Sequence, residues 1–398
     1  MMTNPPISDY RGHKLLSDRI ASAQVRLRDK LLALDVTSSG ISEYNQRYLG
    51  EKIRCVESSL QLYSRLLYFS LSDNSVPLER FTLVDYGGGS GILSFLAKEI
   101  GVGTIVYNDI YDVSCVDVRL LSNIFGLPLD HVFCGDIDDL ISYLRLNSLS
   151  VDAITSYDVL EHIYDVEYHF KRLGSLSDGQ FRVVYASGAN IENPWYVHTV
   201  TKEQVDTEYK NREKKWGHKE RDMLRAYLDV RKEIISSHAP ELPSDQVEQL
   251  SRLTRGLIQP DIEKCVDEYR RQGSIDYLPD HLTNTCDPYT GNWCEHLMEL
   301  GWLEQILKYE GFSVEILPGY YGSSGSLLKK YTKIFINAAI RLLGRRGMFL
   351  APYYILYAEF LAEQSAHWTG GIRRHFREVF WLRVFPAPRQ SPRPPTCQ

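Results

Sequence analysis

The stretch Leu83-Val84-Asp85-Tyr86-Gly87-Gly88-Gly89-Ser90-Gly91 decides the fold of this chain, because an apolar run ends there in an acid and four glycines. Residues 81–84 are typical of a short buried strand, and residues 92–100 have a helical pattern. Glycine has no Cβ, so the loop between them lets the backbone approach a ligand closely. The helix N-terminus beside the loop adds unpaired N–H groups. The stretch therefore predicts a nucleotide-type binding corner.

The spacing of the glycines distinguishes between ligand types. A dinucleotide loop, G-x-G-x-x-G, starting at Gly87 requires a third glycine where the chain has Ile92. A phosphate loop ends in G-K-[ST], and no lysine stands there. The observed acid-x-Gly-x-Gly-x-Gly pattern resembles the first motif of class I S-adenosylmethionine-dependent methyltransferases. This resemblance implies that the amino-acid part of the cofactor binds at Asp85, Gly87, Gly88, Gly89 and Gly91.

The following segments occur in the order in which this family has its strands. Residues 104–108 form a β-like run that ends at Asp109, about 20 residues after the glycines, where a doubly wound fold places an acid on a ribose diol. Residues 132–138 resemble the third strand, 151–162 the fourth strand with its Asp-x-x-Glu-His turn, and 181–186 the fifth. The resemblance implies further cofactor contacts from Asp109, Ile110, Asp136, Ile137, Tyr157 and Asp158.

The same resemblance implies an α/β fold with a seven-stranded, doubly wound and mostly parallel sheet, N-terminal helices and a large helical insertion. Residues 312–317 and 353–360 are expected to form its antiparallel sixth and seventh strands, preceded by a helix over 295–310. We expect five parts: an N-terminal helical cap (1–80), a cofactor-binding core (81–190), a helical lid (191–292), the end of the core (293–365) and a C-terminal extension (366–398).

Size and charge restrict the partners. The 398 residues exceed one typical domain, and 43% hydrophobic residues indicate a well-packed soluble protein. The net charge is −6, and the charged helical segments 201–235 and 245–271 have no basic excess, which argues against nucleic acid as a partner. The chain has no apolar run of 18 residues, so no transmembrane segment is expected.

Cysteine usage indicates the compartment. The seven cysteines are irregularly spaced, odd in number and without a C-x-x-C pair, which favours a reducing environment. The chain opens on a polar, proline-containing segment that is unlike a signal peptide. We therefore expect a cytoplasmic protein. No metal is predicted, because the usual zinc-ligand spacing is not met by His281, Cys286, Cys294 and His296.

The two edges of the predicted lid differ from its charged middle. Residues 193–199 and 281–296 are rich in aromatic, histidine and amide groups, which suit a binding surface better than a core. Both edges leave or enter the sheet at the carboxyl ends of its strands, where ligands bind in such folds. We therefore predict substrate contacts for Tyr44 of the N-terminal helices and for His198, Trp293 and His296.

An amphipathic stripe lies between the last two predicted strands, flanked by lysine and arginine. Its apolar positions are Leu327, Leu328, Tyr331, Ile334, Phe335, Ala338 and Leu342. Packing of this stripe on the core is favoured, and peripheral contact with a membrane surface is the alternative. The tail after Ala366 mixes aromatic residues with arginines and is expected to be a partly ordered appendage.

Methyl transfer from a sulfonium is an in-line displacement, so the protein mainly aligns the nucleophile, the methyl group and the sulfur. An amine acceptor needs little further help, whereas a hydroxyl needs a general base, most often histidine. In this family the turn after the fourth strand opens beside the methyl group, which makes His162 the predicted base.

We therefore expect O-methylation of a small polar or glycan-type acceptor. The first alternative is an N-methyltransferase acting on a small amine or amino sugar. The second is a catalytically silent cofactor-binding scaffold. The third is a nicotinamide-dependent oxidoreductase, which the glycine spacing disfavours.

Overall fold

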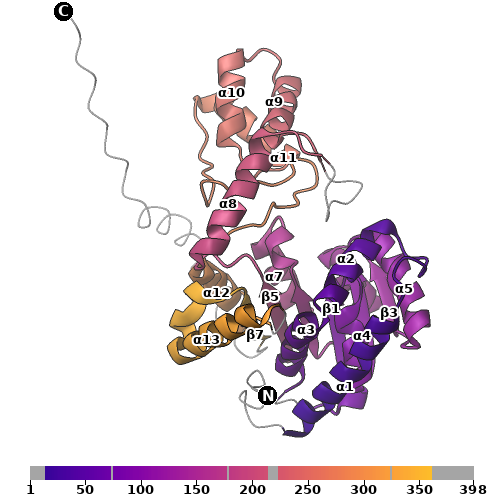
Figure 1. Cartoon of the computed structure of the whole chain (residues 1–398). Coiled ribbons are helices and arrows are strands. Elements are labelled where there is room, and N and C mark those ends of the chain that lie inside the picture. Colours follow the sequence, from indigo (N-terminus) through magenta and orange to yellow (C-terminus); the bar gives the residue numbers. More distant parts are fainter. Residues whose placement is uncertain (1–13, 73–74, 177–178, 214–222, 323–324, 361–398) are drawn as a thin grey trace, which may run out of the picture.

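A seven-stranded sheet forms the centre of the computed structural model, which describes residues 14–72, 75–176, 179–213, 223–322 and 325–360 (Figure 1). The strand order is β3-β2-β1-β4-β5-β7-β6. Strands β1 to β5 pair in parallel, and β7 is antiparallel to both of its neighbours. The predicted fold class is confirmed. The strands are β1 (Thr82–Tyr86), β2 (Thr104–Asp109), β3 (His131–Cys134), β4 (Ala153–Tyr157), β5 (Phe181–Ser187), β6 (Phe312–Pro318) and β7 (Tyr354–Phe360).

Helices cover both faces of the sheet and build the insertion. The α-helices are α1 (Lys14–Ala33), α2 (Glu43–Arg54), α3 (Val56–Leu71), α4 (Ile92–Ile100), α5 (Asp112–Phe125), α6 (Ile137–Leu146), α7 (Val166–Gly174), α8 (Pro194–Tyr209), α9 (Tyr227–His238), α10 (Ser244–Leu253), α11 (Gln259–Gln272), α12 (Leu300–Tyr309) and α13 (Leu327–Leu343). Short 3-10 helices are η2 (Leu78–Arg80), η3 (Leu160–His162) and η4 (Gly344–Leu350).

Two apolar cores lie on opposite faces of the sheet. Successive strand side chains point to opposite faces, so Leu83 packs with α1, α3, α4 and α5, while Val84 packs with α6, α7 and α12. Both residues are fully buried, as expected for a parallel sheet that is covered on both sides. The N-terminal helices α1 and α3 thus form part of a layer on the sheet, and α2 reaches the carboxyl ends of the strands.

The helical insertion separates β5 from α12. Helix α8 leads away from the sheet, and α9, α10 and α11 pack around a small apolar core of their own (Figure 1). Residues 273–299 return to the sheet without forming a helix or strand. The helix expected from Glu295 begins at Leu300 instead. Glu295 has a φ of +54°, a conformation that interrupts an α-helix.

The expected core packing of the amphipathic stripe is wrong. On α13 the side chains of Leu328, Tyr331, Phe335 and Leu342 are 78%, 57%, 74% and 88% exposed, whereas Ile340 on the opposite side is fully buried. No α-helix in the described part of the chain is long and apolar enough to cross a membrane. The predicted C-terminal extension, 366–398, lies outside the described residues.

A buried ion pair fastens α9 to α8. The guanidinium of Arg231 donates to the Glu208 carboxylate, and both side chains are almost completely buried. Arg231 Nε also donates to the Ser251 carbonyl at 2.8 Å, and the Thr285 hydroxyl donates to Glu208 Oε2 at 2.8 Å. Because these hydrogen bonds replace solvation by water, removing one partner leaves a poorly compensated buried charge.

The substitution Arg231→Met should destabilise the insertion by about 3 kcal/mol, because it leaves the Glu208 carboxylate buried without its main cation. The free energy of opening is measured by hydrogen exchange of the amides in α9, α10 and α11. Arg225→Met is the matched control, since Arg225 pairs with Glu233 at the surface and its loss should change little. Equal effects of the two substitutions would contradict this account.

Candidate functional site

The glycine loop joins β1 to α4 at the carboxyl edge of the sheet. Gly87, Gly89 and Gly91 have φ values of +69°, +52° and +74°, in the left-handed region that favours glycine. A Cβ at Gly87 would collide with Val159, and one at Gly91 would lie 2.5 Å from Val118. A Cβ at Gly89 would meet no atom within 4 Å. The loop is therefore packed against protein at its ends and open at Gly89.

Asp109 at the end of β2 holds this loop in place. The Gly89 N–H donates to Asp109 Oδ2 at 2.9 Å, and the Tyr107 hydroxyl donates to the Gly89 carbonyl at 2.6 Å. Asp109 Oδ1 accepts from the Tyr111 N–H at 2.8 Å. A carboxylate oxygen can accept more than one hydrogen bond. Asp109 therefore orders the loop while keeping capacity to accept further hydrogen bonds.

Asp85 lies beneath the loop and is only 2% exposed. Its Oδ2 accepts hydrogen bonds from the hydroxyl and the N–H of Ser94, at 2.6 and 3.1 Å. Burial raises the pKa of Asp85 to about 7; the Ser94 hydrogen bonds oppose this rise, and the Asp109 charge adds to it. The Asp85 side chain thus anchors the first turn of α4 and supports the loop from below.

The remaining residues predicted on the cofactor side lie at the ends of β2 and β3. Ile110 is 54% exposed beside Asp109, whereas the Ile137 side chain is buried in the core. Asp136 is the exposed N-cap of α6 and accepts N–H hydrogen bonds from Asp138 and Asp139 at 2.9 and 3.1 Å. Gly88 has no room for a side chain, because a Cβ there would collide with the Tyr107 ring and the Asp85 carboxyl group.

The turn after β4 carries Tyr157, Asp158 and His162. Asp158 has a φ of +54°, and its Oδ1 accepts from the Gly188 N–H at 3.3 Å. His162 Nδ1 lies 2.9 Å from the Trp293 carbonyl oxygen. Since a carbonyl can only accept, Nδ1 carries the proton, and Nε2 of the neutral ring keeps its lone pair. His162 is thereby oriented as a base.

Three further acidic or hydroxyl side chains surround His162, and the sequence did not single them out as site residues. Glu295 Oε1 lies 3.9 Å from His162 Nε2, and Glu295 Oε2 accepts from the Tyr196 hydroxyl at 2.7 Å. Glu161 is 1% exposed, and its Oε2 has no partner among the described residues. Burial raises the pKa of Glu161 well above its usual range, and the charges of Asp158 and Glu295 add to this. The Asp-x-x-Glu-His motif contained Glu161, but Tyr196 and Glu295 carried no such signal.

Backbone strain is concentrated at this turn. Among the described residues, the non-glycine positions with positive φ are Ser148, Asp158 and Glu295. Such a conformation costs about 1–2 kcal/mol for a residue with a Cβ. Two of the three flank His162, a distribution typical of functional sites.

Two of the predicted substrate contacts on the lid, Trp293 and His296, direct their side chains into packing and contact the turn after β4 through their backbone. Trp293 is 7% exposed and stacks between Tyr164 and His296, with ring centroids 6.2 and 4.0 Å away. His296 pairs with Asp280 at 2.6 Å. The Trp293 carbonyl nevertheless contacts His162, and the His296 N–H donates to the Glu161 carbonyl at 3.0 Å. The return of the insertion is therefore pinned to the turn after β4 by its backbone.

The two remaining residues predicted as substrate contacts, His198 and Tyr44, lie on α8 and α2. His198 is exposed on α8, and residues two apart on a helix point in nearly opposite directions, so it faces away from the side where Tyr196 meets Glu295. Tyr44 packs edge-on against Tyr111, next to Asp109, at a centroid distance of 5.1 Å. Its helix is held by Asn45, whose amide donates to Asp117 of α5 at 2.7 Å.

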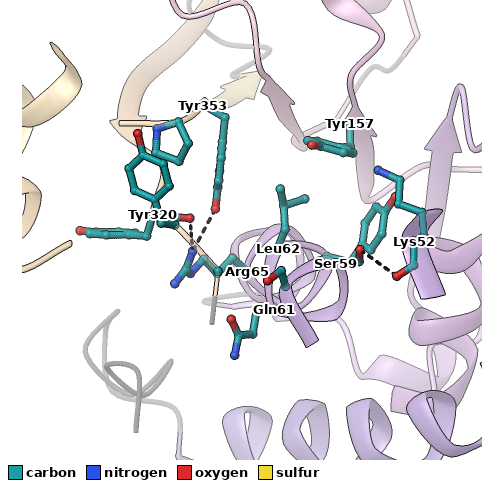
Figure 2. A pocket seen from close by; sticks show the side chains of 13 residues that line it. Lys52, Ser59, Gln61, Leu62, Arg65, Tyr157, Tyr320 and Tyr353 are labelled. Carbon is teal, nitrogen blue, oxygen red and sulfur yellow. Dashed lines mark hydrogen bonds between the residues drawn. The ribbon is translucent and has the colours of Figure 1, made fainter. Parts of the chain in front are cut away.

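The structure contains a cleft of about 200 Å³ beside the turn after β4, between α3 and the start of β7 (Figure 2). Lys52 and Tyr157 lie at one end, and Arg65 lies with Tyr353 at the other (Figure 2). Lys52 Nζ is 4.7 Å from the centroid of the Tyr157 ring. Burial acts to lower the pKa of Lys52, but Tyr63 and Asp158 outweigh it, so the pKa is raised. The complete lining is Lys52, Ser58, Ser59, Gln61, Leu62, Tyr63, Arg65, Tyr157, Tyr320, Tyr321, Gly322, Pro352 and Tyr353.

Arg65 and Tyr157 define the chemistry of this cleft. Arg65 donates to the Tyr353 hydroxyl at 2.9 Å and lies 4.9 Å from the Tyr320 ring centroid. Tyr157 packs edge-on against Tyr63 at 5.7 Å. Cations and aromatic rings in one cleft suit a flat ligand that carries anionic groups. In the described part of the chain, no three His, Cys, Asp or Glu side chains are grouped as metal ligands.

Comparison with known proteins gives a structural likeness only. No protein-family model matches the chain, and no curated protein does. Solved structures that match include the plantazolicin methyltransferase BpumL in complex with SAH, which is 11% identical over 87% of this chain and 99% of its own, with a TM-score of 0.34. An S-adenosylmethionine dependent methyltransferase from Mesorhizobium loti is 12% identical over 77% and 99%, with a TM-score of 0.35.

A putative methyltransferase in complex with the Haloferax volcanii Trm112 activator is 12% identical over 79% of this chain and 96% of its own. Its TM-score is 0.37. Identities and TM-scores in this range transfer neither a ligand nor an activity from those proteins to this one. The site must therefore be interpreted from its own residues.

The substitution Asp85→Asn should flatten the pH dependence of stability. The folded-state pKa of about 7 lies above the unfolded value of about 3.9, so the folded state holds the proton in between. Stability is therefore lost as pH rises from about 4 to 7. Between about pH 4 and pH 7 the free energy of unfolding of the variant should therefore rise by roughly 3–4 kcal/mol relative to that of the wild type. Urea unfolding at a series of pH values measures this, and equal slopes for both proteins would contradict the account.

Proposed function

We propose that this chain is an S-adenosylmethionine-dependent methyltransferase that methylates an oxygen atom of a small polar or glycan-type acceptor. The observation that carries the proposal is the open side of the glycine loop at Gly89, beside the carboxylate of Asp109. The acid-x-Gly-x-Gly-x-Gly spacing supports the proposal, as does the antiparallel β7 that the resemblance implies.

The residues at the strand ends fit this cofactor. Gly89 offers backbone without a Cβ, Asp109 offers acceptor oxygens for a ribose diol, and the exposed Ile110 offers an apolar surface for a base. Asp136 stands at the next strand end, and Tyr157 and Asp158 follow β4. When bound, the cofactor supplies an electrophilic methyl group on a sulfonium.

The acceptor is proposed to bind at the turn after β4, with the cleft at Lys52 as its entry. Because the pKa of Lys52 is raised, this side chain stays protonated and attracts an electron-rich or anionic group. Tyr157 and Tyr63 provide flat surfaces for a ring, and Tyr44 closes the side near Asp109.

His162 is proposed to remove the proton from an acceptor hydroxyl. Its Nδ1 is fixed by the Trp293 carbonyl, so Nε2 receives the proton. Glu295, 3.9 Å from Nε2, then stabilises the imidazolium, and the Tyr196 hydroxyl keeps the Glu295 carboxylate in position. Burial raises the pKa of Glu161 well above its usual range, which favours the neutral form of this carboxyl group and so reduces its competition with Glu295. In this arrangement Trp293 positions the base through its backbone. From the first edge of the lid, Tyr196 rather than the predicted His198 contributes to the site.

N-methylation of an amine or amino sugar is the main alternative. The acids Asp158 and Glu295 near His162 would attract a cationic amine, so this reading rests on the same cluster. A silent cofactor-binding scaffold would keep the glycine loop without using His162. O-methylation requires His162 as a base, whereas neither of these two alternatives does.

The substitution Gly89→Ala should weaken S-adenosylmethionine binding by at least about tenfold, because the new Cβ enters the space where the backbone approaches the ligand. Calorimetry on the purified variant measures the affinity. Gly126→Ala is the matched control: Gly126 also has a positive φ, +62°, and open space, but ends α5. Unchanged affinity in Gly89→Ala, or saturable NADH binding to the wild type, would contradict the cofactor assignment.

His162→Ala should lower turnover by about 10²–10⁴ with little change in cofactor affinity, because the residue acts only on the nucleophile. Glu295→Gln should lower turnover less, since it removes only the stabilisation of the imidazolium. Transfer of a labelled methyl group to a panel of hydroxyl and amine compounds provides the assay. His198→Ala is the matched control and should retain wild-type turnover. Full activity of His162→Ala on an amine would instead favour N-methylation.

A further inference from the structure

Helix α13 exposes a continuous apolar stripe. Its members Leu328, Tyr331, Phe335, Ala338 and Leu342 recur at intervals of three and four residues, so they lie along one side of the helix. The large side chains among them are 57–88% exposed. Ile340 and Asn337, both buried, attach the opposite side to the protein. The helix is therefore apolar on two sides, and the protein covers only one of them.

All charged residues of this helix and of the turn after it are basic. Residues 327–349 contain no aspartate or glutamate, although the whole chain has a net charge of −6. The basic residues are Lys329, Lys330, Lys333, Arg341, Arg345 and Arg346. Among the described residues, no acid forms an ion pair with Lys329 or Lys330 at the N-terminal turn, whereas Arg345 is paired with Glu192 and Glu304. The exposed lysines at the N-terminal turn are thus available to an external anion.

We propose that α13 docks on an anionic phospholipid surface. An exposed apolar stripe on a helix whose polar side carries lysine and arginine is the pattern of a helix that lies in the membrane interface, where the stripe enters the acyl boundary and the long basic side chains reach the headgroups. A second copy of the chain docked on this stripe would place its own basic α13 against the first, and the two helices would repel each other. The arginine-rich segment after residue 366 has the same sign of charge as the helix and would also be repelled.

The helix is connected directly to the cleft of the proposed acceptor site. Asn337, on the buried side of α13, accepts from the Tyr321 N–H at 2.8 Å and donates to the Tyr321 carbonyl at 2.9 Å. Tyr321 is part of the cleft lining. Docking of α13 would therefore hold one wall of the cleft close to the bilayer. This inference goes beyond the proposed methyl transfer and does not depend on it.

The test is co-sedimentation of the full-length protein with vesicles of phosphatidylcholine alone or mixed with phosphatidylglycerol. We expect binding to the anionic vesicles that weakens as salt is raised. The double substitution F335S/L342S should reduce the partition coefficient at least about tenfold, because it removes two large apolar side chains from the stripe. K329E/K330E should reduce it by a similar factor.

Matched controls separate the helix from general effects. Leu146→Ser replaces another apolar side chain that is 85% exposed, and K171E/K202E makes the same change in net charge on α7 and α8. Both controls should bind vesicles within about threefold of the wild type. Absence of wild-type binding to anionic vesicles, or equal binding by the α13 variants, would overturn the proposal. So would a wild-type dimer in light scattering that F335S/L342S dissolves, since a second copy would then occupy the stripe.

Discussion

The parallel pairing of β1 with β2 and β4 is the constraint on which the candidate site depends. Register places Tyr86 beside Asn108 and Asp85 beside Thr155, so the glycine loop, Asp109 and the turn after β4 all begin at one edge of the sheet. In that position the Asp109 carboxylate can hold the Gly89 N–H at 2.9 Å. An antiparallel partner for β1 would have put one of these groups at the far edge.

The insertion contributes to the same edge through backbone hydrogen bonds. The His296 N–H donates to the Glu161 carbonyl at 3.0 Å, and the Trp293 carbonyl accepts from His162 Nδ1 at 2.9 Å. These contacts join segments about 130 residues apart and present Glu295 to the histidine. The strained φ of Glu295 is retained because the flanking backbone is held at both sides. The separate core of α9, α10 and α11 lets the insertion be large without disturbing the sheet.

Asp158 connects the two halves of the proposed acceptor region. Its charge favours the protonated form of Lys52 in the cleft on one side and raises the pKa of Glu161 on the other. The cleft therefore favours a cation at Lys52, while the neutral form is favoured at Glu161. Buried charge elsewhere, at Glu208 and Arg231, is satisfied by close pairing and serves packing instead. On α13, by contrast, Lys329 and Lys330 are exposed and form no ion pair with any acid in the described part of the chain.

The sequence by itself determined where the strands and the glycine loop lie along the chain. An apolar run, a glycine loop and a helical period are local patterns, and each needs only a few neighbouring residues. It also located Asp109 and the Asp-x-x-Glu-His turn. Only the tertiary structure decided that Glu295 lies beside His162 and is held there by Tyr196. It also decided that His198 is exposed, that the rings of Trp293 and His296 stack on each other, and that the stripe of α13 is exposed. Those outcomes depend on which side of a helix or loop is covered by distant segments, and burial of that kind is a property of the packed chain rather than of any local pattern.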